Sequence, residues 1–366
     1  KDIISQSVAK ALYGEVSPYS ATRLERFAAC AFAHFLQYGM KLTERVEYEF
    51  KPMDMGNVMH EALESFAEEV RKRGMKWTEL TEQERNEIAD RCLDNIVADY
   101  GNTVLKSSAR NEYMIERTRR ILRRTVWALQ KQLEQGEFQP EGFEVTFGGG
   151  RIDRVDIMED QNKVYVKVID YKTGNTSFDL VYLYHGLQLQ LMIYLDGALR
   201  VEQKKYPDKE IIPAGVFYYN IKDPMIQEKI DADVEAVSAG LMKELKMNGL
   251  VQADPELVYR MDSSLGSIPV SFNKDGNFRK NSSVADRTQF AVLGRYVRTK
   301  IEKIRSSILE GDAEVSPYEL GKKNACTYCP YMTVCGFDRR LSGYEFRRLK
   351  NFSDEELWKA FDREAE

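Results

Sequence analysis

Two charged residues, Asp170 and Lys172, lie two positions apart in the segment KVYVKVIDYKTG. Val164, Val166 and Val168 recur at every second position before them, which predicts a β-strand with both charged side chains on the face of the valines. A carboxylate can hold a divalent metal ion that polarises phosphate and water, and an ammonium group can orient the nucleophile or offset developing charge. The pair therefore suits phosphodiester hydrolysis, although Asp-x-Lys by itself is more often a surface ion pair.

A second carboxylate lies on the preceding predicted strand, GGRIDRVDIM, and two aspartates compete for the role. Asp153 shares its parity with apolar residues of the strand, whereas Asp156 shares parity with Arg154 and is expected to face outward. The turn-forming EDQN joins this strand to that of Asp170, which predicts a hairpin. We therefore expect Asp153 to share a metal ion with Asp170, unless a bulge reverses the alternation.

Three further polar residues lie on predicted helices. His60 lies outside the apolar stripe of its helix, and neutral imidazole is a common metal ligand. Gln190 and Tyr194 are four residues apart on another helix, where an amide and a phenol could fix the lysine or touch substrate. Each of the three has an alternative as an ordinary helix residue, and we expect His34 and His185 to be structural.

Cysteines form the other candidate site. Cys326, Cys329 and Cys335 have the spacing C-x2-C-x5-C, and a closed site needs a fourth ligand, for which Cys30 is the candidate. Cys92 is expected to be a buried thiol, since five cysteines in a chain of this length are too few for a disulfide framework. Spacing alone does not choose between structural zinc and an iron-sulfur cluster, because both accept four thiolates.

The elements that would position these residues follow from periodicity. The segment Ala21–Tyr38 carries apolar residues at helical spacing, with Ser20 placed as an N-cap, and a second helix starts near Gly56. Charged helical segments follow, and then the hairpin. After it we expect a helix over Asp179–Arg200, a third strand at AGVFYYNI and a long helix over Ala285–Leu309 that leads into the cysteine segment.

Composition limits the functions available. With 43% hydrophobic residues, the chain of 366 residues can bury a full core. No stretch is apolar enough to span a membrane, and the polar N-terminal residues lack the apolar core of a secretory signal, so we expect a cytoplasmic protein. The formal net charge of −5 argues against general coating of nucleic acid, so any such contact is expected to be local.

One basic segment contrasts with this acidic average. RTRRILRRTVWALQK contains six basic residues and no acidic one. Its apolar residues would bury one face and leave Arg119, Arg120, Arg123 and Arg124 outside. Such a run is usually a solvated face. The functional alternative is a strip that leads single-stranded DNA to the metal, because guanidinium groups bind phosphate oxygens.

Taken in order, GNVMH, GRIDRVD, VIDYKTG and QLMIY resemble the GxxxH, IDxV, DYK and QxxxY motifs of RecB-family nucleases in the PD-(D/E)XK superfamily. The resemblance implies three metal ligands: His60, Asp153 and Asp170. It also implies a catalytic lysine and an accessory motif: Lys172, Gln190 and Tyr194.

One upstream cysteine and three clustered after these motifs are similar to the arrangement in AddB subunits of helicase-nucleases. The resemblance favours a [4Fe-4S] cluster on Cys30, Cys326, Cys329 and Cys335. It implies an α/β fold: a restriction-endonuclease-like PD-(D/E)XK core with a helical N-terminal insertion and a four-cysteine iron-sulfur staple. The expected organisation is an N-terminal segment with the first cluster cysteine (1–55), the nuclease core with its helical insertion (56–250), a segment with the cysteine cluster (251–345) and a C-terminal tail (346–366).

The expected function is a deoxyribonuclease dependent on Mg²⁺ or Mn²⁺, an exonuclease on single-stranded DNA ends in double-strand break repair and recombination. DNA as substrate and an AddA-type partner subunit rest on the resemblance. No GxxxxGK[ST] loop occurs and helicase-like domains are absent, so we expect no ATP hydrolysis and a fragment or free-standing relative. Two alternatives stay open: a non-catalytic iron-sulfur module that binds DNA ends, and a stand-alone nuclease on another nucleic acid.

Overall fold

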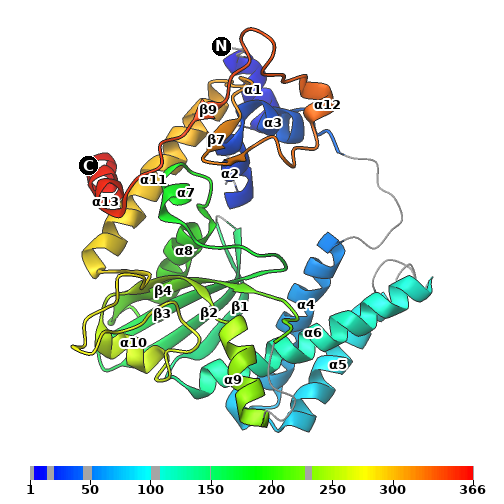
Figure 1. Cartoon of the computed structure of the whole chain (residues 1–366), viewed down its shortest axis with the longest axis vertical. Coiled ribbons are helices and arrows are strands. Elements are labelled where there is room, and N and C mark those ends of the chain that lie inside the picture. Colours follow the sequence, from blue (N-terminus) through cyan, green and yellow to red (C-terminus); the bar gives the residue numbers. More distant parts are fainter. Residues whose placement is uncertain are drawn as a thin grey trace.

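A six-stranded sheet lies at the centre of the molecule (Figure 1). The computed structural model describes residues 4–14, 20–43, 52–99, 108–148, 150–226 and 233–365. The strands lie in sequence order: β1 (Gln139–Phe147), β2 (Gly150–Asp160), β3 (Lys163–Lys172), β4 (Glu210–Asn220), β5 (Asn248–Gln252) and β6 (Val284–Ala285). The pairs β3–β4 and β5–β6 are parallel, and the other neighbouring pairs are antiparallel.

The predicted hairpin is confirmed, because β2 and β3 pair from Arg154 opposite Ile169 to Asp160 opposite Lys163. The third predicted strand corresponds to β4, which begins four residues earlier and ends one residue earlier than predicted. Between β3 and β4 the chain crosses over through α7 (Leu180–Tyr184) and α8 (Gln190–Lys205), so the predicted single helix is in fact two. Gly186, with φ 78°, lies in the break, in a left-handed conformation that glycine adopts at little cost. The break makes Gln190 the first residue of α8.

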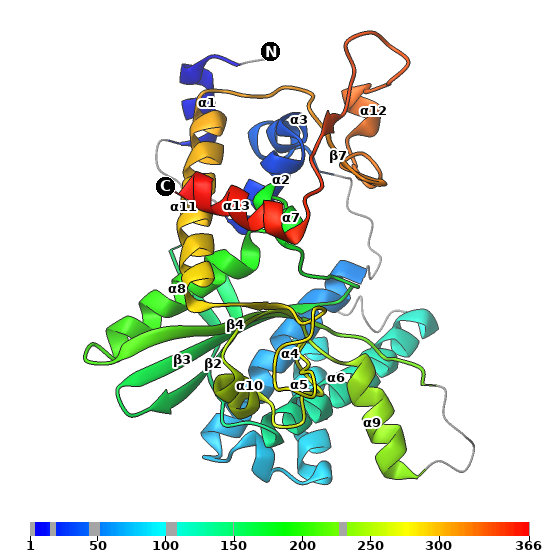
Figure 2. The ribbon, with the colours of Figure 1, turned by 60° about the vertical axis from the view of Figure 1, so that its left-hand side comes forward.

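Helices cover both faces of the sheet, and each face has its own hydrophobic core. One core includes residues of α4 (Pro52–Lys72), α5 (Glu82–Asp99), α6 (Ala109–Glu134) and α10 (Pro255–Met261). The other core includes residues of α8, of α11 (Arg287–Leu309) and of α13 (Asp354–Ala365). Two short helices, the 3₁₀ turn Trp77–Glu79 and α9 (Val234–Glu244), complete this part of the chain. Figure 2 shows α4, α5 and α6 on the side of the sheet away from α11 and α13.

The first predicted helix is broken at Cys30. After α1 (Gln6–Tyr13), the chain forms α2 (Ala21–Ala29), α3 (Ala31–His34) and a π-helical turn (Phe35–Gly39). The predicted cap is confirmed, because the Ser20 side chain accepts a hydrogen bond from the Arg23 backbone N–H. Cys30 is extended, with φ −166° and ψ 118°, and the helical hydrogen-bond ladder is interrupted just after it, where the Phe32 N–H donates to Glu314 O and not to a residue of α2.

The C-terminal region forms a second, three-stranded sheet beside these N-terminal helices (Figures 1 and 2). Its elements are β7 (Tyr318–Leu320), β8 (Lys323–Asn324), α12 (Met332–Cys335) and β9 (Arg347–Arg348). The Phe32 backbone N–H donates to Glu314 O at 3.0 Å, and the Tyr331 hydroxyl donates to Leu42 O at 3.0 Å. These contacts join segments from opposite ends of the sequence.

Asp156 does not face outward, and this prediction was wrong. Its side chain is fully buried, and it forms ion pairs of 2.5 and 3.0 Å with Arg154 and Lys167, which are also buried. Burial alone would raise the pKa of Asp156, but these two positive charges hold that pKa below its usual range. The error arose because alternation identifies the two sides of a strand, whereas the helices α4–α6 that cover this side come from elsewhere in the chain.

The central sheet continues across the predicted boundary at residue 250, because β5 spans it and β6 pairs with β5. The predicted first segment includes residues 44–51, which lie outside the described ranges. None of the described helices is both long enough and apolar enough to cross a membrane.

Candidate active site

The residues singled out by the motifs line one hollow, at the end of β3. It lies between the first turns of α4, the ends of β1 to β3 and the start of α8. All six residues predicted for the nuclease site contribute to its wall: His60, Asp153, Asp170, Lys172, Gln190 and Tyr194. The fold thus brings together side chains that lie up to 134 positions apart, from His60 to Tyr194.

Lys172 is held by two oxygen atoms. Its Nζ lies 2.5 Å from Asp170 Oδ2 and donates a hydrogen bond of 2.7 Å to Gln190 Oε1. Gln190 Nε2 in turn donates to the Tyr194 hydroxyl at 2.8 Å. The ammonium group also lies 5.5 Å from the ring centroid of Tyr218 on β4. The accessory residues therefore fix the position of the lysine.

Asp153 is fixed by the backbone of β3. Its Oδ2 accepts a hydrogen bond of 2.7 Å from the Tyr171 N–H, where the side chain replaces a strand carbonyl as the acceptor. Burial, followed by the negative charge of Asp153, raises the pKa of Asp170 to about 7. Two carboxylates whose charges repel in a buried wall are a donor set that fits a divalent cation.

His60 lies beside the same carboxylate. Its Nδ1 is 3.4 Å from Asp153 Oδ2, and its Nε2 is 3.1 Å from Tyr171 O. Burial disfavours the charged imidazole, but Asp153 and Glu144 outweigh burial and raise the pKa of His60 to about 10. A metal ion bound here would take the place of the imidazolium charge, because imidazole ligates only in its neutral form.

Glu144 on β1 was missed by the sequence analysis. Its Oε1 lies 3.8 Å from His60 Nδ1, and its side chain is only 6% exposed. His60, Glu144 and Asp153 offer ligand atoms that all lie within 4.8 Å of one another. Glu144 belongs to none of the recognised motifs, and the alternation of β1 gives no signal because the strand is irregular.

Glu25 on α2 is the second residue that sequence reasoning missed. Its Oε1 accepts hydrogen bonds from the backbone N–H groups of Leu189 and Gln190, at 2.7 and 3.0 Å, at the start of α8. Burial outweighs these bonds and raises the pKa of Glu25 to about 7. An acidic residue in the predicted first helix gives no sequence signal that it caps a helix more than a hundred residues later.

The two other histidines lie outside the hollow. His34 is fully buried and accepts a hydrogen bond of 3.1 Å from Arg23 Nε. His185 Nε2 lies 2.8 Å from Lys350 O. Both positions agree with a structural role.

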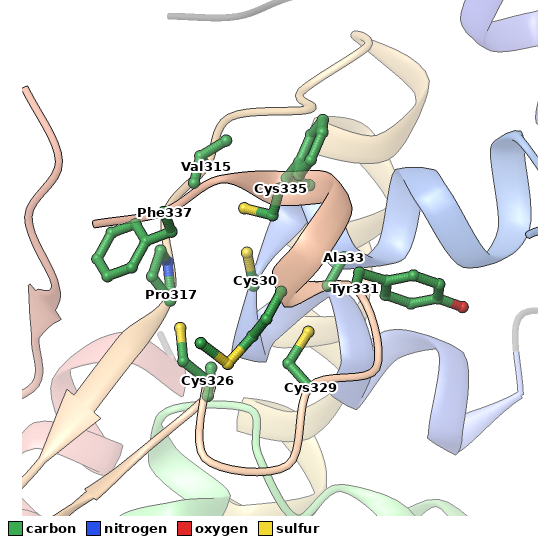
Figure 3. A pocket seen from close by; sticks show the side chains of 12 residues that line it. Cys30, Ala33, Val315, Pro317, Cys326, Cys329, Tyr331, Cys335 and Phe337 are labelled. Atoms are coloured by element: carbon green, nitrogen blue, oxygen red, sulfur yellow. The ribbon is translucent and has the colours of Figure 1, made fainter. Parts of the chain in front are cut away.

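The four predicted cluster cysteines surround a second hollow, and their sulfur atoms point into it (Figure 3). Cys30 comes from the break between α2 and α3, and the other three come from the loop around α12. Burial, and after it the neighbouring thiols, raises the pKa of Cys326 to about 11. Cys92 is buried in the core, as predicted. All five cysteines are free of disulfide bonds.

Most of the basic strip on α6 is already ion-paired. Arg119 Nη2 lies 2.7 Å from Asp94 Oδ1, and Arg123 Nε donates to Asp90 Oδ1 at 2.8 Å. Arg120, which is 61% exposed, pairs with Asp223 at 2.5 Å. Arg124 forms no ion pair with a described residue. The four arginines line a shared hollow with Trp127, but Arg119 and Arg123 primarily connect α6 to α5.

The sheet, its crossover helix and this arrangement of two aspartates and a lysine define a nuclease fold of the PD-(D/E)XK type. A sequence profile described as "PD-(D/E)XK nuclease superfamily" matches residues 18–336. The chain belongs to this superfamily.

Three similar proteins are each named as the B subunit of an "ATP-dependent helicase/deoxyribonuclease". The chain is 43% identical to the protein of Lachnoclostridium phytofermentans, over 99% of this chain and 33% of that relative. It is 36% identical to the protein of Caldanaerobacter subterraneus, over 97% of this chain and 32% of that relative. It is 35% identical to the protein of Clostridium acetobutylicum, over 99% of this chain and 33% of that relative. The chain thus spans about a third of the length of these relatives. The predicted resemblance to AddB subunits is confirmed.

Proposed function

We propose that this chain is a deoxyribonuclease that depends on Mg²⁺ or Mn²⁺. The observation that carries the proposal is the convergence of Asp153, Asp170 and Lys172 on one hollow beside His60. A divalent cation held by His60, Asp153 and Asp170 would polarise the phosphate and activate a water molecule. The oxygen and imidazole donors of this set fit such an ion.

Lys172 would act on the substrate itself. Its ammonium group is held at 2.5 Å from Asp170 and 2.7 Å from Gln190, which leaves its direction fixed before substrate binds. A fixed positive charge can stabilise the negative charge that develops on the phosphate oxygens, at little cost in reorganisation. Gln190 and Tyr194 would orient the lysine through their mutual hydrogen bond.

The substrate proposed is the end of a single DNA strand, which is degraded during double-strand break repair and recombination. Support comes from the word deoxyribonuclease in the names of the relatives and from the family. The relatives are named as B subunits of a helicase/deoxyribonuclease, so we propose an AddA-type subunit as partner. Arg119 and Arg123 are engaged with α5. Arg124 forms no ion pair with a described residue, and Arg120 pairs with Asp223 but is 61% exposed, so these two arginines are the members of the basic strip that could contact phosphate.

The cysteine site is proposed to hold a [4Fe-4S] cluster on Cys30, Cys326, Cys329 and Cys335. Zinc would hold four thiolates at about 2.3 Å and therefore about 3.8 Å from one another. In the part of the chain that the structure describes, no three of these sulfur atoms all lie within 4.8 Å of one another. This spacing exceeds what a single zinc ion requires and therefore supports an iron-sulfur cluster, for which the four cysteines would be the ligands.

A nuclease assay tests the proposal. The chain is incubated with single-stranded DNA, duplex DNA and RNA, each labelled at the 5′ or the 3′ end, in Mg²⁺ or in EDTA. We expect shortening of single-stranded DNA from an end in Mg²⁺ and none in EDTA. Asp170→Asn, which keeps the size of the side chain, serves as the inactive control.

Other outcomes identify the alternatives. Tight binding of DNA ends without cleavage in either metal would favour the non-catalytic module. Faster cleavage of RNA would favour a nuclease on another nucleic acid. Cleavage in EDTA, or by Asp170→Asn at the wild-type rate, would overturn the proposed active site.

A further inference from the structure

We propose that Glu144 is a ligand of the divalent cation, together with His60 and Asp153. The inference rests on the proposed function and adds a carboxylate that the nuclease motifs do not contain. Glu144, His60 and Asp153 offer ligand atoms within 4.8 Å of one another, a spacing that one ion can bridge after small side-chain movements. Asp170, the third ligand proposed above, lies outside this tight group and contacts Lys172 at 2.5 Å, so Glu144 would add to the ligand set and not replace Asp170.

The pairing of the strands places Glu144 and Asp153 face to face. Phe143 pairs with Arg154 and Val145 pairs with Ile152, so Glu144 and Asp153 are the opposed residues between these pairs. Two carboxylates directly opposite each other on neighbouring strands repel, and such pairs destabilise a sheet. His60, which lies beside both carboxylates, offsets part of this repulsion, and a divalent cation between them would turn it into attraction.

At this pair the side chains of both strands change from one face of the sheet to the other. Arg154 lies 5.7 Å from the ring centroid of Phe143, and both belong to the side of the sheet that packs against α4–α6. Val145 and Ile152, two positions away, pack in the opposite core instead. This change of face is centred on Glu144, whose φ of 49° is left-handed. A non-glycine residue in that region is uncommon, and such residues concentrate at functional sites.

An ion pair with Arg151 does not account for the position of Glu144. Arg151 Nε contacts Glu144 Oε2, but the arginine side chain is 64% exposed whereas that of Glu144 is 6% exposed. A pair of this kind, open to solvent on one side, is worth little. It would not require the carboxylate to lie in the wall of the hollow beside His60 and Asp153.

Binding of Mn²⁺ to the purified chain without DNA tests the inference. The free ion is measured by its electron paramagnetic resonance signal during titration. We expect Glu144→Gln to weaken Mn²⁺ binding at least tenfold. Glu64→Gln, which neutralises another carboxylate lining the same hollow, should change the affinity less than threefold. Arg151→Gln should leave the affinity unchanged or increase it, because Glu144 then loses a competing cation.

Folding is checked by thermal melting in EDTA. Glu144→Gln should melt close to the wild-type temperature, because the variant removes both the repulsion from Asp153 and the attraction to His60 and Arg151. If Glu144→Gln does not fold, Glu144→Asp replaces it: this variant keeps the charge but withdraws the carboxylate, and should also weaken Mn²⁺ binding.

The outcomes separate this inference from the proposed function. A wild-type chain that binds no Mn²⁺ would contradict both. Tight Mn²⁺ binding by wild type and by both Glu144 variants would overturn only the role of Glu144. Weakening by Arg151→Gln as large as that by Glu144→Gln would also overturn it, since Glu144 would then act through a structural ion pair.

Discussion

Glu25 caps the helix that carries Gln190. The Glu25 carboxylate accepts the Gln190 backbone N–H at 3.0 Å, while the Gln190 side chain accepts a hydrogen bond from Lys172. The next residue along α2, Arg26, lies with its Nη2 3.8 Å from Cys329 Sγ. The helix α2 therefore contacts the candidate active site and the cysteine site through adjacent residues, and it ends at Cys30.

Replacing Glu25 by Gln should change how stability depends on pH. Burial raises the pKa of Glu25 from 4.5 to about 7, so between these values the folded chain keeps a proton that the unfolded chain releases. Ionisation of Glu25 therefore lowers the unfolding free energy as pH rises from about 4.5 to 7, by on the order of 3 kcal/mol. Glu25→Gln keeps an acceptor for both N–H groups but cannot ionise. Urea unfolding in EDTA should show the variant gaining stability over wild type between pH 5 and pH 8. Parallel pH profiles would contradict the burial of an ionisable Glu25.

Asp170→Asn and Lys172→Ala should abolish cleavage without unfolding the chain. Removal of a metal ligand or of the fixed ammonium group eliminates charge stabilisation in the transition state, which typically costs on the order of 100-fold in rate or more. Asp170 is buried where ionisation is unfavourable, so the amide should not destabilise the fold. Cleavage rates and melting temperatures are measured on the same preparations. If a variant loses cleavage and also melts at a much lower temperature than wild type, its loss of activity is due to unfolding.

Asp153→Asn and Asp156→Asn should fail in different ways. Asp153→Asn should remove cleavage and leave folding intact, since the amide oxygen can still accept the Tyr171 N–H. Asp156→Asn should lower the unfolding free energy by about 3–5 kcal/mol, because it leaves Arg154 and Lys167 buried without their counter-ion. Urea unfolding distinguishes the two variants. A stable Asp156→Asn chain would show that the buried ion pairs matter little.

Loss of a single cluster cysteine should remove iron and weaken the fold. Ligation by Cys30 and the loop around α12 would tie the first helices to the C-terminal region, and binding free energy is then folding free energy. Anaerobically purified wild type should be brown, and Cys30→Ala, Cys326→Ala, Cys329→Ala or Cys335→Ala should lose iron, melt lower and bind DNA poorly. Cys92→Ala, a buried thiol in the core, is the matched control and should keep its iron. Colourless protein with one zinc per chain, after preparation with iron and sulfide, would replace the cluster with zinc.

The four arginines of the basic strip should fall into two pairs, one that contributes to DNA binding and one that contributes to stability. Arg120→Gln with Arg124→Gln should weaken binding of single-stranded DNA and reduce the slope of log affinity against log salt by about 1.4, at about 0.7 per lost phosphate contact. Arg119→Gln with Arg123→Gln should mainly lower the melting temperature, because these arginines hold Asp90 and Asp94 on α5. An unchanged salt slope in the first pair would leave the strip as a solvated helix face.

The sequence by itself determined the local parts of this protein. Alternation and turn residues predicted the hairpin of β2 and β3, and the third strand and the long helix α11 followed from the same patterns. Ordered motifs also selected side chains that line one hollow, because each motif marks a fixed position within its own strand or helix. Periodicity and motif spacing record such positions directly.

Only the tertiary structure decided what covers each element and what opposes each side chain. Asp156 is buried because α4–α6 pack over its side of the sheet, and Glu25 reaches the start of α8 from another part of the sequence. Glu144 faces Asp153 because the side chains of both strands change face at that pair, which interrupts the alternation that sequence reasoning relies on. Periodicity tells which side of its own element a residue occupies, but contacts between distant segments arise only when the chain packs.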